Sequence, residues 1–338
     1  MRRLYLFRSN LKSLEYYHKY HTLEEFLNNC HDYYLLFPLW TLVQNHFDEV
    51  IIWRLSDKPL PDIIFDIEGK KFIQKWLTNL SHVLDYPSCD VSFWRGGFRE
   101  YDIVTRMKPD HFGLKLYLGA GKRTFPQWGG IYDIFLIEDE RDFVKGRMCL
   151  PFYKTASPYI FKPLSSKLKW DICWPCNFTQ INYKGQEFFI NLISKNDSLK
   201  KLKIVHCGNK PEVGKKLCQK VGIKNIEFTG SVDRIKLNEI LNKSKFGLNL
   251  SNLQDGCPRI STEIIMSGTP LILRDSVRIL NYYKKPGVLV FNDNSLSKGI
   301  QNCMFNYDKY KKYILNLIDN ELSFENISKK NIEEWKKI

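Results

Sequence analysis

Three observations predict an α/β protein made of two Rossmann-like domains. The chain has 338 residues, enough for two domains that each bury a core. From about residue 167 onward, short apolar segments alternate with amphipathic ones, which is typical of a parallel sheet covered by helices. A segment rich in proline and serine, 150–167, separates this region from a less regular first half of similar kind.

The elements follow from two periodicities. Short runs rich in β-branched and aromatic residues predict strands, and apolar residues three or four positions apart predict the helices between them. In the second half we expect strands at 169–175, 202–208, 226–230, 246–251, 270–275 and 287–291, with helices at 184–196, 211–223, 235–244 and 259–268. In the first half we expect strands at 49–55, 89–94, 114–121 and 132–139.

These elements predict three parts of the chain. Residues 1–163 form a first Rossmann-like domain, 164–315 form a second, and 316–338 form a helical tail that packs back on the first domain. Ligands of parallel sheets bind at the carboxyl ends of the strands. The loop after the strand at 246–251 therefore lies on the functional edge of the second domain.

The composition is that of a soluble globular protein, with 43% hydrophobic and 26% charged residues. The longest apolar run, 33–43, is too short to span a bilayer and contains Pro38, so we expect it in the core. The N-terminus has no pattern of a signal peptide. We expect a cytoplasmic protein, with a peripheral position on a membrane as a further option.

The nine cysteines are scattered, which indicates reduced thiols rather than a disulfide framework. Cys173 and Cys176 form a C-x-x-C pair, but no second pair or histidine lies at the spacing of a zinc site. We interpret them as core cysteines and expect no metal and no cofactor.

The net charge of +14 lies in the second half of the chain. Residues 1–150 contain 20 basic and 20 acidic residues, so the whole excess falls after them, mainly in 195–224 and 309–337. A basic half of this kind suits nucleotide phosphates, nucleic acid or an acidic membrane surface.

The segment DGCPRISTE (255–263) is the most informative stretch. Pro258 suits the first turn of a helix, so we expect a helix from about Arg259. Its start presents unpaired N–H groups and a positive dipole end, which together bind a diphosphate. Asp255 can accept hydrogen bonds from a sugar, and Glu263 can accept two from a ribose. The order of these groups fits a nucleotide sugar.

This arrangement resembles the E-x7-E motif of the family 4 glycosyltransferases (glycosyl transferases group 1), which have the GT-B fold of two Rossmann-like domains facing each other across a cleft. Further segments resemble motifs of that family in the correct order. They are the interdomain segment at 150–163, a G-R-x-x-x-x-K-G stretch at 176–193, an F-x-G stretch at 226–251 and the E-A-M-A-x-G-x-P-V-I stretch at 263–272.

The resemblance implies a role for each matching residue. Lys184 neutralises the leaving diphosphate, Asp255 holds the donor sugar, and Glu263 binds the ribose. The other implied donor-binding residues are Thr179, Gly230, Ser251, Gly256, Cys257, Pro258, Arg259, Ser261 and Thr262.

The sequence departs from the family pattern at three points of the donor site. Thr179 stands where the family has an arginine, which removes a positive charge from the diphosphate site; Arg259, Lys122 and Arg123 are candidates to replace it. The first acid of the motif is Asp255 rather than a glutamate, and Gly256-Cys257-Pro258 stands where the family has Gly-Phe-Gly, which leaves the identity of the donor sugar open.

Two glycine-rich turns of the first half are expected to line the acceptor side of the cleft. They contain Arg95, Gly96, Gly119, Lys122 and Arg123. The second turn is not a phosphate-binding P-loop, because Leu116 occupies the position of the first glycine.

The expected function is sugar transfer from a nucleotide sugar, with a UDP-sugar as the expected donor, to a hydroxyl of a surface glycan or lipid-linked saccharide. The family implies a retaining reaction, and the absence of a convincing D-x-D motif from the sequence favours one that is independent of a metal. Two alternatives stay open: transfer to a modified base in DNA, and a degenerate fold that acts as a binding module.

Overall fold

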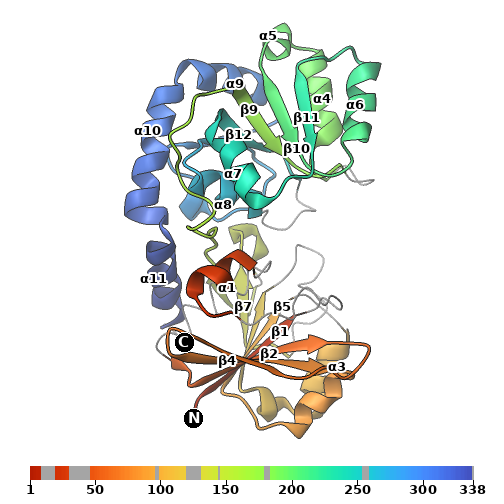
Figure 1. Cartoon of the computed structure of the whole chain (residues 1–338), viewed down its shortest axis with the longest axis vertical. Coiled ribbons are helices and arrows are strands. Elements are labelled where there is room, and N and C mark those ends of the chain that lie inside the picture. The colour runs from red at the N-terminus through yellow and green to blue at the C-terminus, as the bar shows by residue number, and fades with distance from the viewer. Residues whose placement is uncertain are drawn as a thin grey trace. The chain divides into compact units, whose positions relative to one another are not determined.

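The computed structural model describes residues 1–8, 20–29, 46–95, 99–118, 131–143, 145–178, 183–252 and 259–336. The chain divides into two compact units, one made of Met1–Tyr153 with Ser328–Ile338 and the other of Lys154–Ile327 (Figure 1). The join at residue 153 lies within the proline- and serine-rich segment, ten residues before the boundary expected at 163. The apolar run at 33–43 lies outside the described residues.

The first unit contains an eight-stranded sheet among its described residues, in the order β3-β4-β2-β1-β5-β6-β7-β8. All neighbouring strands are parallel except β3 and β4. The strands are β1 (Arg3–Arg8), β2 (Glu49–Leu55), β3 (Ile63–Ile67), β4 (Lys70–Leu77), β5 (Val91–Arg95), β6 (Leu114–Leu118), β7 (Ile134–Ile137) and β8 (Met148–Pro151). The described helices are α1 (Leu23–Asn29), α3 (Arg99–Met107) and the short η2 (Leu80–Asp85), η3 (Pro109–Phe112) and η4 (Glu140–Asp142).

The four strands expected in this half are confirmed as β2, β5, β6 and β7, but the sequence did not predict β1. Its residues Leu4, Tyr5, Leu6 and Phe7 are almost completely buried, and the strand pairs with β2 on one side and β5 on the other. Because arginines bound this apolar run at both ends, it is too short to show the sequence pattern of a central strand.

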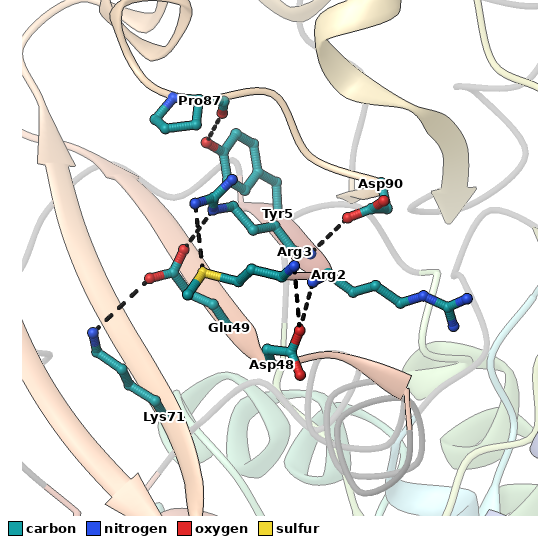
Figure 2. A network of polar contacts seen from close by, with 9 residues as sticks. Arg2, Arg3, Tyr5, Asp48, Glu49, Lys71, Pro87 and Asp90 are labelled. Atoms are coloured by element: carbon teal, nitrogen blue, oxygen red, sulfur yellow. Dashed lines mark hydrogen bonds and ion pairs between the residues drawn. The ribbon is translucent and has the colours of Figure 1, made fainter.

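Carboxylates compensate the charges at the amino edge of this sheet (Figure 2). Glu49 pairs with Arg3 at 2.8 Å and with Lys71 at 4.0 Å. Asp48 accepts the backbone N–H of Arg2 at 2.7 Å, and Asp90 accepts that of Arg3 at the same distance. The acids at the starts of the neighbouring strands thus fix the position of the first residues of β1.

The second unit contains a six-stranded parallel sheet among its described residues, in the order β11-β10-β9-β12-β13-β14. The strands are β9 (Trp170–Pro175), β10 (Ile204–Cys207), β11 (Ile226–Gly230), β12 (Ser244–Asn249), β13 (Leu271–Arg274) and β14 (Val288–Phe291). Numbered within the unit, this order is 3-2-1-4-5-6, that of a Rossmann fold. All six strands expected from the sequence are confirmed.

Helices connect these strands as expected from the sequence. They are α4 (Gln186–Ser194), α5 (Asp197–Lys200), α6 (Pro211–Lys220), α7 (Arg234–Asn242), α8 (Arg259–Met266), α9 (Leu296–Phe305), α10 (Tyr307–Leu317) and α11 (Phe324–Trp335), with η5 (Asn281–Tyr283) and η6 (Ile318–Leu322) between them. From Ser328 onward, α11 belongs to the first unit, where Asn331 exchanges hydrogen bonds of 3.0 and 2.9 Å with the backbone of Tyr153. Within the described ranges, no helix combines the length and apolarity needed to cross a bilayer.

Gly247 allows α8 to pack closely on β12. A methyl group at Gly247 would lie 2.5 Å from Cγ2 of Ile264, below normal van der Waals contact. Ile264 is completely buried, so it cannot turn aside into solvent. The distance between this strand and this helix therefore depends on the absence of a side chain at position 247.

We expect Gly247→Ala to lower the free energy of unfolding by about 1–3 kcal/mol through overpacking. In an Ile264→Ala background the added methyl has room, so the same change should cost clearly less. Urea denaturation of the parent, both single variants and the double variant measures this coupling. Additive effects of the two changes would show that the close contact does not limit packing.

Candidate functional site

In the second sheet, the topology places the candidate site at the carboxyl ends of the neighbouring strands β9 and β12. Strand order reverses there, and the loops that follow the two strands leave the sheet in opposite directions, which makes this edge the usual ligand site of such folds. The loop after β9 leads to Lys184 and α4, whereas the loop after β12 leads to α8. The two functional segments expected from sequence therefore leave adjacent strands.

A turn before α4 brings Lys184 directly against the end of β12. The backbone N–H of Asn252 donates to the carbonyl of Tyr183 over 2.8 Å. Gly185 has a φ of +72°, and a Cβ there would lie 2.5 Å from the carbonyl oxygen of Leu250. Because only glycine fits this conformation and approach, Gly185 is required for the turn to dock at the end of β12. The Lys184 ammonium lies 4.9 Å from the ring centroid of Tyr183.

Helix α8 places two hydroxyls in internal hydrogen bonds. Ser261 is completely buried, and its Oγ accepts a 2.8 Å bond from Nδ2 of Asn249 at the end of β12. The hydroxyl of Thr262 donates to the carbonyl of Arg259 over 2.8 Å. The bond between Asn249 and Ser261 ties the start of α8 to the carboxyl end of β12, and the Thr262 bond lies within the first turn of α8.

Glu263 is the buried acid of this edge, with 8% of its surface exposed. Burial raises the pKa of its carboxyl, while the positive charges of Arg259 and Arg234 act in the opposite direction. A nearby positive charge favours the ionised form of a carboxyl, so the two guanidinium groups offset part of the cost of burying the Glu263 carboxylate.

Arg234 was not predicted by sequence analysis. It is the first residue of α7, where Asp233 caps the helix by accepting a 2.7 Å bond from the backbone N–H of Lys236. No motif marks Arg234, and it lies far from Glu263 in the sequence. The only available signal was its place at the start of a helix that follows a strand, which puts it on the carboxyl edge.

Three further predicted residues lie at strand ends. Gly230 ends β11 with a φ of +77°, and the nearest atom to a Cβ there would be 3.9 Å away, so its space is open. Ser251 is buried beyond β12, and its carbonyl accepts a 3.0 Å bond from the Ser276 hydroxyl. Arg95 ends β5 of the first unit and is half-buried.

The remaining predicted site residues lie outside the described part of the chain. They are Thr179, Asp255, Gly256, Cys257 and Pro258 on the donor side, and Gly96, Gly119, Lys122 and Arg123 on the acceptor side. Their roles stay predictions.

The C-x-x-C pair consists of free thiols, with Cys173 buried in β9 and Cys176 just after it. The Sγ of Cys176 lies 3.5 Å from Nε2 of His206, whose burial lowers its pKa to about 4. Among the described residues, no group of three or more His, Cys, Asp or Glu side chains could hold a metal ion.

Residues 180–332 match the family model described as "Glycosyl transferases group 1". No curated protein sequence matches the chain.

Among solved structures, the chain is similar to sucrose-phosphate synthase from Thermosynechococcus elongatus (12% identity, TM-score 0.64, covering 100% of this chain and 99% of that one). It is also similar to the E. coli trehalose-6-phosphate protein bound with UDP-2-fluoro glucose (10%, 0.66, 99% of each chain). A third is the lipopolysaccharide outer core galactosyltransferase WaaB in its apo form (11%, 0.64, 100% of each chain).

The two sheets and the similarity to these solved structures give the chain the GT-B fold of two Rossmann-like domains. The segment that matches the glycosyl transferases group 1 model, residues 180–332, contains Lys184, Arg234, Arg259 and Glu263.

The raised pKa of Glu263 predicts a pH-dependent stability difference. A carboxyl whose pKa is raised by folding stabilises the folded state at low pH, and this contribution is lost as pH rises from the usual carboxyl range through the folded pKa. We therefore expect the melting temperature of Glu263→Gln, relative to the parent, to increase between pH 4 and pH 8.

Glu239→Gln is the control, because the ion pair with Lys236 lowers the pKa of Glu239 and gives the opposite sign. Thermal melts of the three proteins across this range test the assignment. A Glu263→Gln difference that does not change with pH would mean that the buried carboxyl titrates normally.

Proposed function

We propose that the protein transfers a sugar from a nucleotide-sugar donor to an acceptor hydroxyl, with the donor bound at the carboxyl edge of the second sheet. The observation that carries this proposal is the juxtaposition at the switch between β9 and β12. There the Lys184 turn docks on the end of β12, which leads to α8 with its buried Glu263.

The chemistry of the leaving group explains the charges. Departure of a nucleoside diphosphate develops negative charge, which fixed cations and helix N-termini stabilise without reorganisation. Lys184 and Arg259 at the start of α8 are the groups proposed for this task. Arg234 is proposed to supply the charge that the family's arginine, replaced here by Thr179, supplies elsewhere.

Glu263 is proposed to accept hydrogen bonds from the ribose. A carboxylate partly desolvated by burial binds hydroxyl donors more strongly than a solvated one. Of the compared structures, the E. coli trehalose-6-phosphate protein holds UDP-2-fluoro glucose, which supports a UDP-sugar as the first donor to test.

For the acceptor, a saccharide of a surface glycan or a lipid-linked saccharide is proposed. The similarity to a lipopolysaccharide outer core galactosyltransferase supports this class. The same proposal includes retention of configuration, independence of metal ions and a position at the cytoplasmic face of a membrane.

The proposal predicts slow hydrolysis and measurable binding of one nucleotide sugar among UDP-, GDP- and ADP-sugars. Lys184→Ala should lower turnover by about tenfold or more with a smaller effect on binding, because its charge acts mainly on the leaving group. Glu263→Ala should weaken nucleotide binding. Calorimetry and nucleotide release measure the two effects. A folded protein that binds none of these donors would overturn the proposal in favour of a binding module without transferase activity.

The proposed role of the two arginines gives a rescue experiment. Arg234→Gln and Arg259→Gln should each lower the rate of donor hydrolysis by about tenfold, and Thr179→Arg should restore part of that loss. Arg147→Gln, an exposed residue of the first unit, is the matched control. Equal rates of donor hydrolysis in the control and in both variants would show that neither arginine acts in the donor site.

A further inference from the structure

The amino edge of the second sheet, opposite the proposed donor site, carries a row of lysines. Lys169, Lys203 and Lys243 each stand one residue before a strand, and Lys224 stands two before β11. The strands that they precede are neighbours in the order β11-β10-β9-β12. Adjacent parallel strands lie about 4.8 Å apart, so the row extends over about 14 Å.

Backbone hydrogen bonds hold these strand starts together. The N–H of Lys169 donates to the carbonyl of Lys243 over 2.8 Å, and the N–H of Ile204 donates to the carbonyl of Asn225 over 3.1 Å. The side-chain amide of Asn225 in turn donates to the carbonyls of Leu199 and Leu202, at 3.0 and 2.8 Å. The edge is thus a connected structure near α5, at the top of Figure 1, and not a set of independent loops.

An open pocket of about 390 Å³ lies at the starts of β9, β10 and β11. Its charged lining consists of Lys169, Lys201, Lys203, Lys224 and Glu227. This volume is within the usual range of sites for small molecules.

Glu227 is already neutralised within the pocket. Its carboxylate accepts a 2.9 Å bond from Nε1 of Trp170 and lies 3.2 Å from the Lys169 ammonium. That ammonium also lies 4.1 Å from the ring centroid of Trp170. Within the pocket lining, the charges of Lys201, Lys203 and Lys224 are therefore left without a balancing acid.

The two amino edges differ in how their acids are placed. At the amino edge of the first sheet, the acids Asp48, Glu49 and Asp90 compensate the basic residues at the same kind of position (Figure 2). At the amino edge of the second sheet, Asp171 accepts the backbone N–H of Lys203 at 2.9 Å, but it forms its ion pair with Lys245, outside the pocket lining. Lysines at the starts of neighbouring strands repel one another, so a bound anion would relieve a repulsion that the first sheet avoids.

We propose that this pocket is a second anion site, which binds a multiply charged phosphate group at the edge of the sheet opposite the donor site. Several lysines act as mobile point charges, an arrangement that suits the high charge of phosphate rather than the planar geometry of a carboxylate. The phosphate group can belong to a free compound or to a phospholipid headgroup. The proposal does not depend on the proposed transferase function.

The test uses the full chain with Lys184→Ala and Glu263→Ala, which disable the proposed donor site so that it does not contribute phosphate binding. Into this background are introduced either Lys203→Gln with Lys224→Gln, or the control pair Lys215→Gln with Lys216→Gln. The control pair removes the same charge from exposed positions of α6. Calorimetry with inorganic pyrophosphate at constant ionic strength, and sedimentation with vesicles of phosphatidylglycerol and phosphatidylcholine, represent the two sources.

We expect the pocket pair to weaken binding of one of these probes by about tenfold and the control pair to leave it unchanged. Pocket-dependent binding of pyrophosphate assigns the site to a free phosphate compound, and pocket-dependent binding of vesicles alone assigns it to a lipid headgroup. Equal losses in the two pairs would mean general attraction to a basic surface and would overturn the proposal. Binding of neither probe, or pocket-dependent binding of duplex DNA alone, would overturn it as well.

Discussion

The parallel ladder between β9 and β12 is the constraint on which the candidate site depends. These strands begin the two halves of the second sheet, so the loops that follow them diverge and leave their backbone groups available at one edge. The 2.8 Å bond from Asn252 to Tyr183 joins these loops, and Gly185 allows their close approach. A shift of either strand would separate Lys184 from the segment that leads to α8.

The two edges of this sheet differ in how their charges are balanced. At the carboxyl edge, Glu263 is buried and two arginines counter the cost of its desolvation. At the amino edge, the lysines are exposed and only Glu227 compensates them within the pocket. A carboxylate shielded from water is stabilised by nearby cations. Solvated lysines, in contrast, tolerate an excess of positive charge, which can attract an anionic ligand.

The sequence predicted the second unit better than the first, for a physical reason. Four of its strands, β9, β10, β12 and β13, are almost wholly buried on both faces and read as near-continuous apolar runs, so their alternation with helices is easily recognised. In the first unit, β1 is bounded by arginines, and β3 alternates buried with exposed residues over only five positions. Arg234 was not predicted because its relation to Glu263 arises from the packing of α7 and α8 and leaves no local pattern.

The sequence by itself determined the class of fold, the order of elements in the second unit, the candidate residues Lys184 and Glu263, and the location of the charge excess in the second half. These properties depend on local periodicity, local motifs and composition. The tertiary structure decided the order of the strands, the docking of the Lys184 turn on β12, the electrostatic effect of Arg234 on Glu263 and the alignment of the lysines along one edge. Each of these joins segments far apart in the chain, and strand order, which local periodicity does not specify, determines which segments become neighbours.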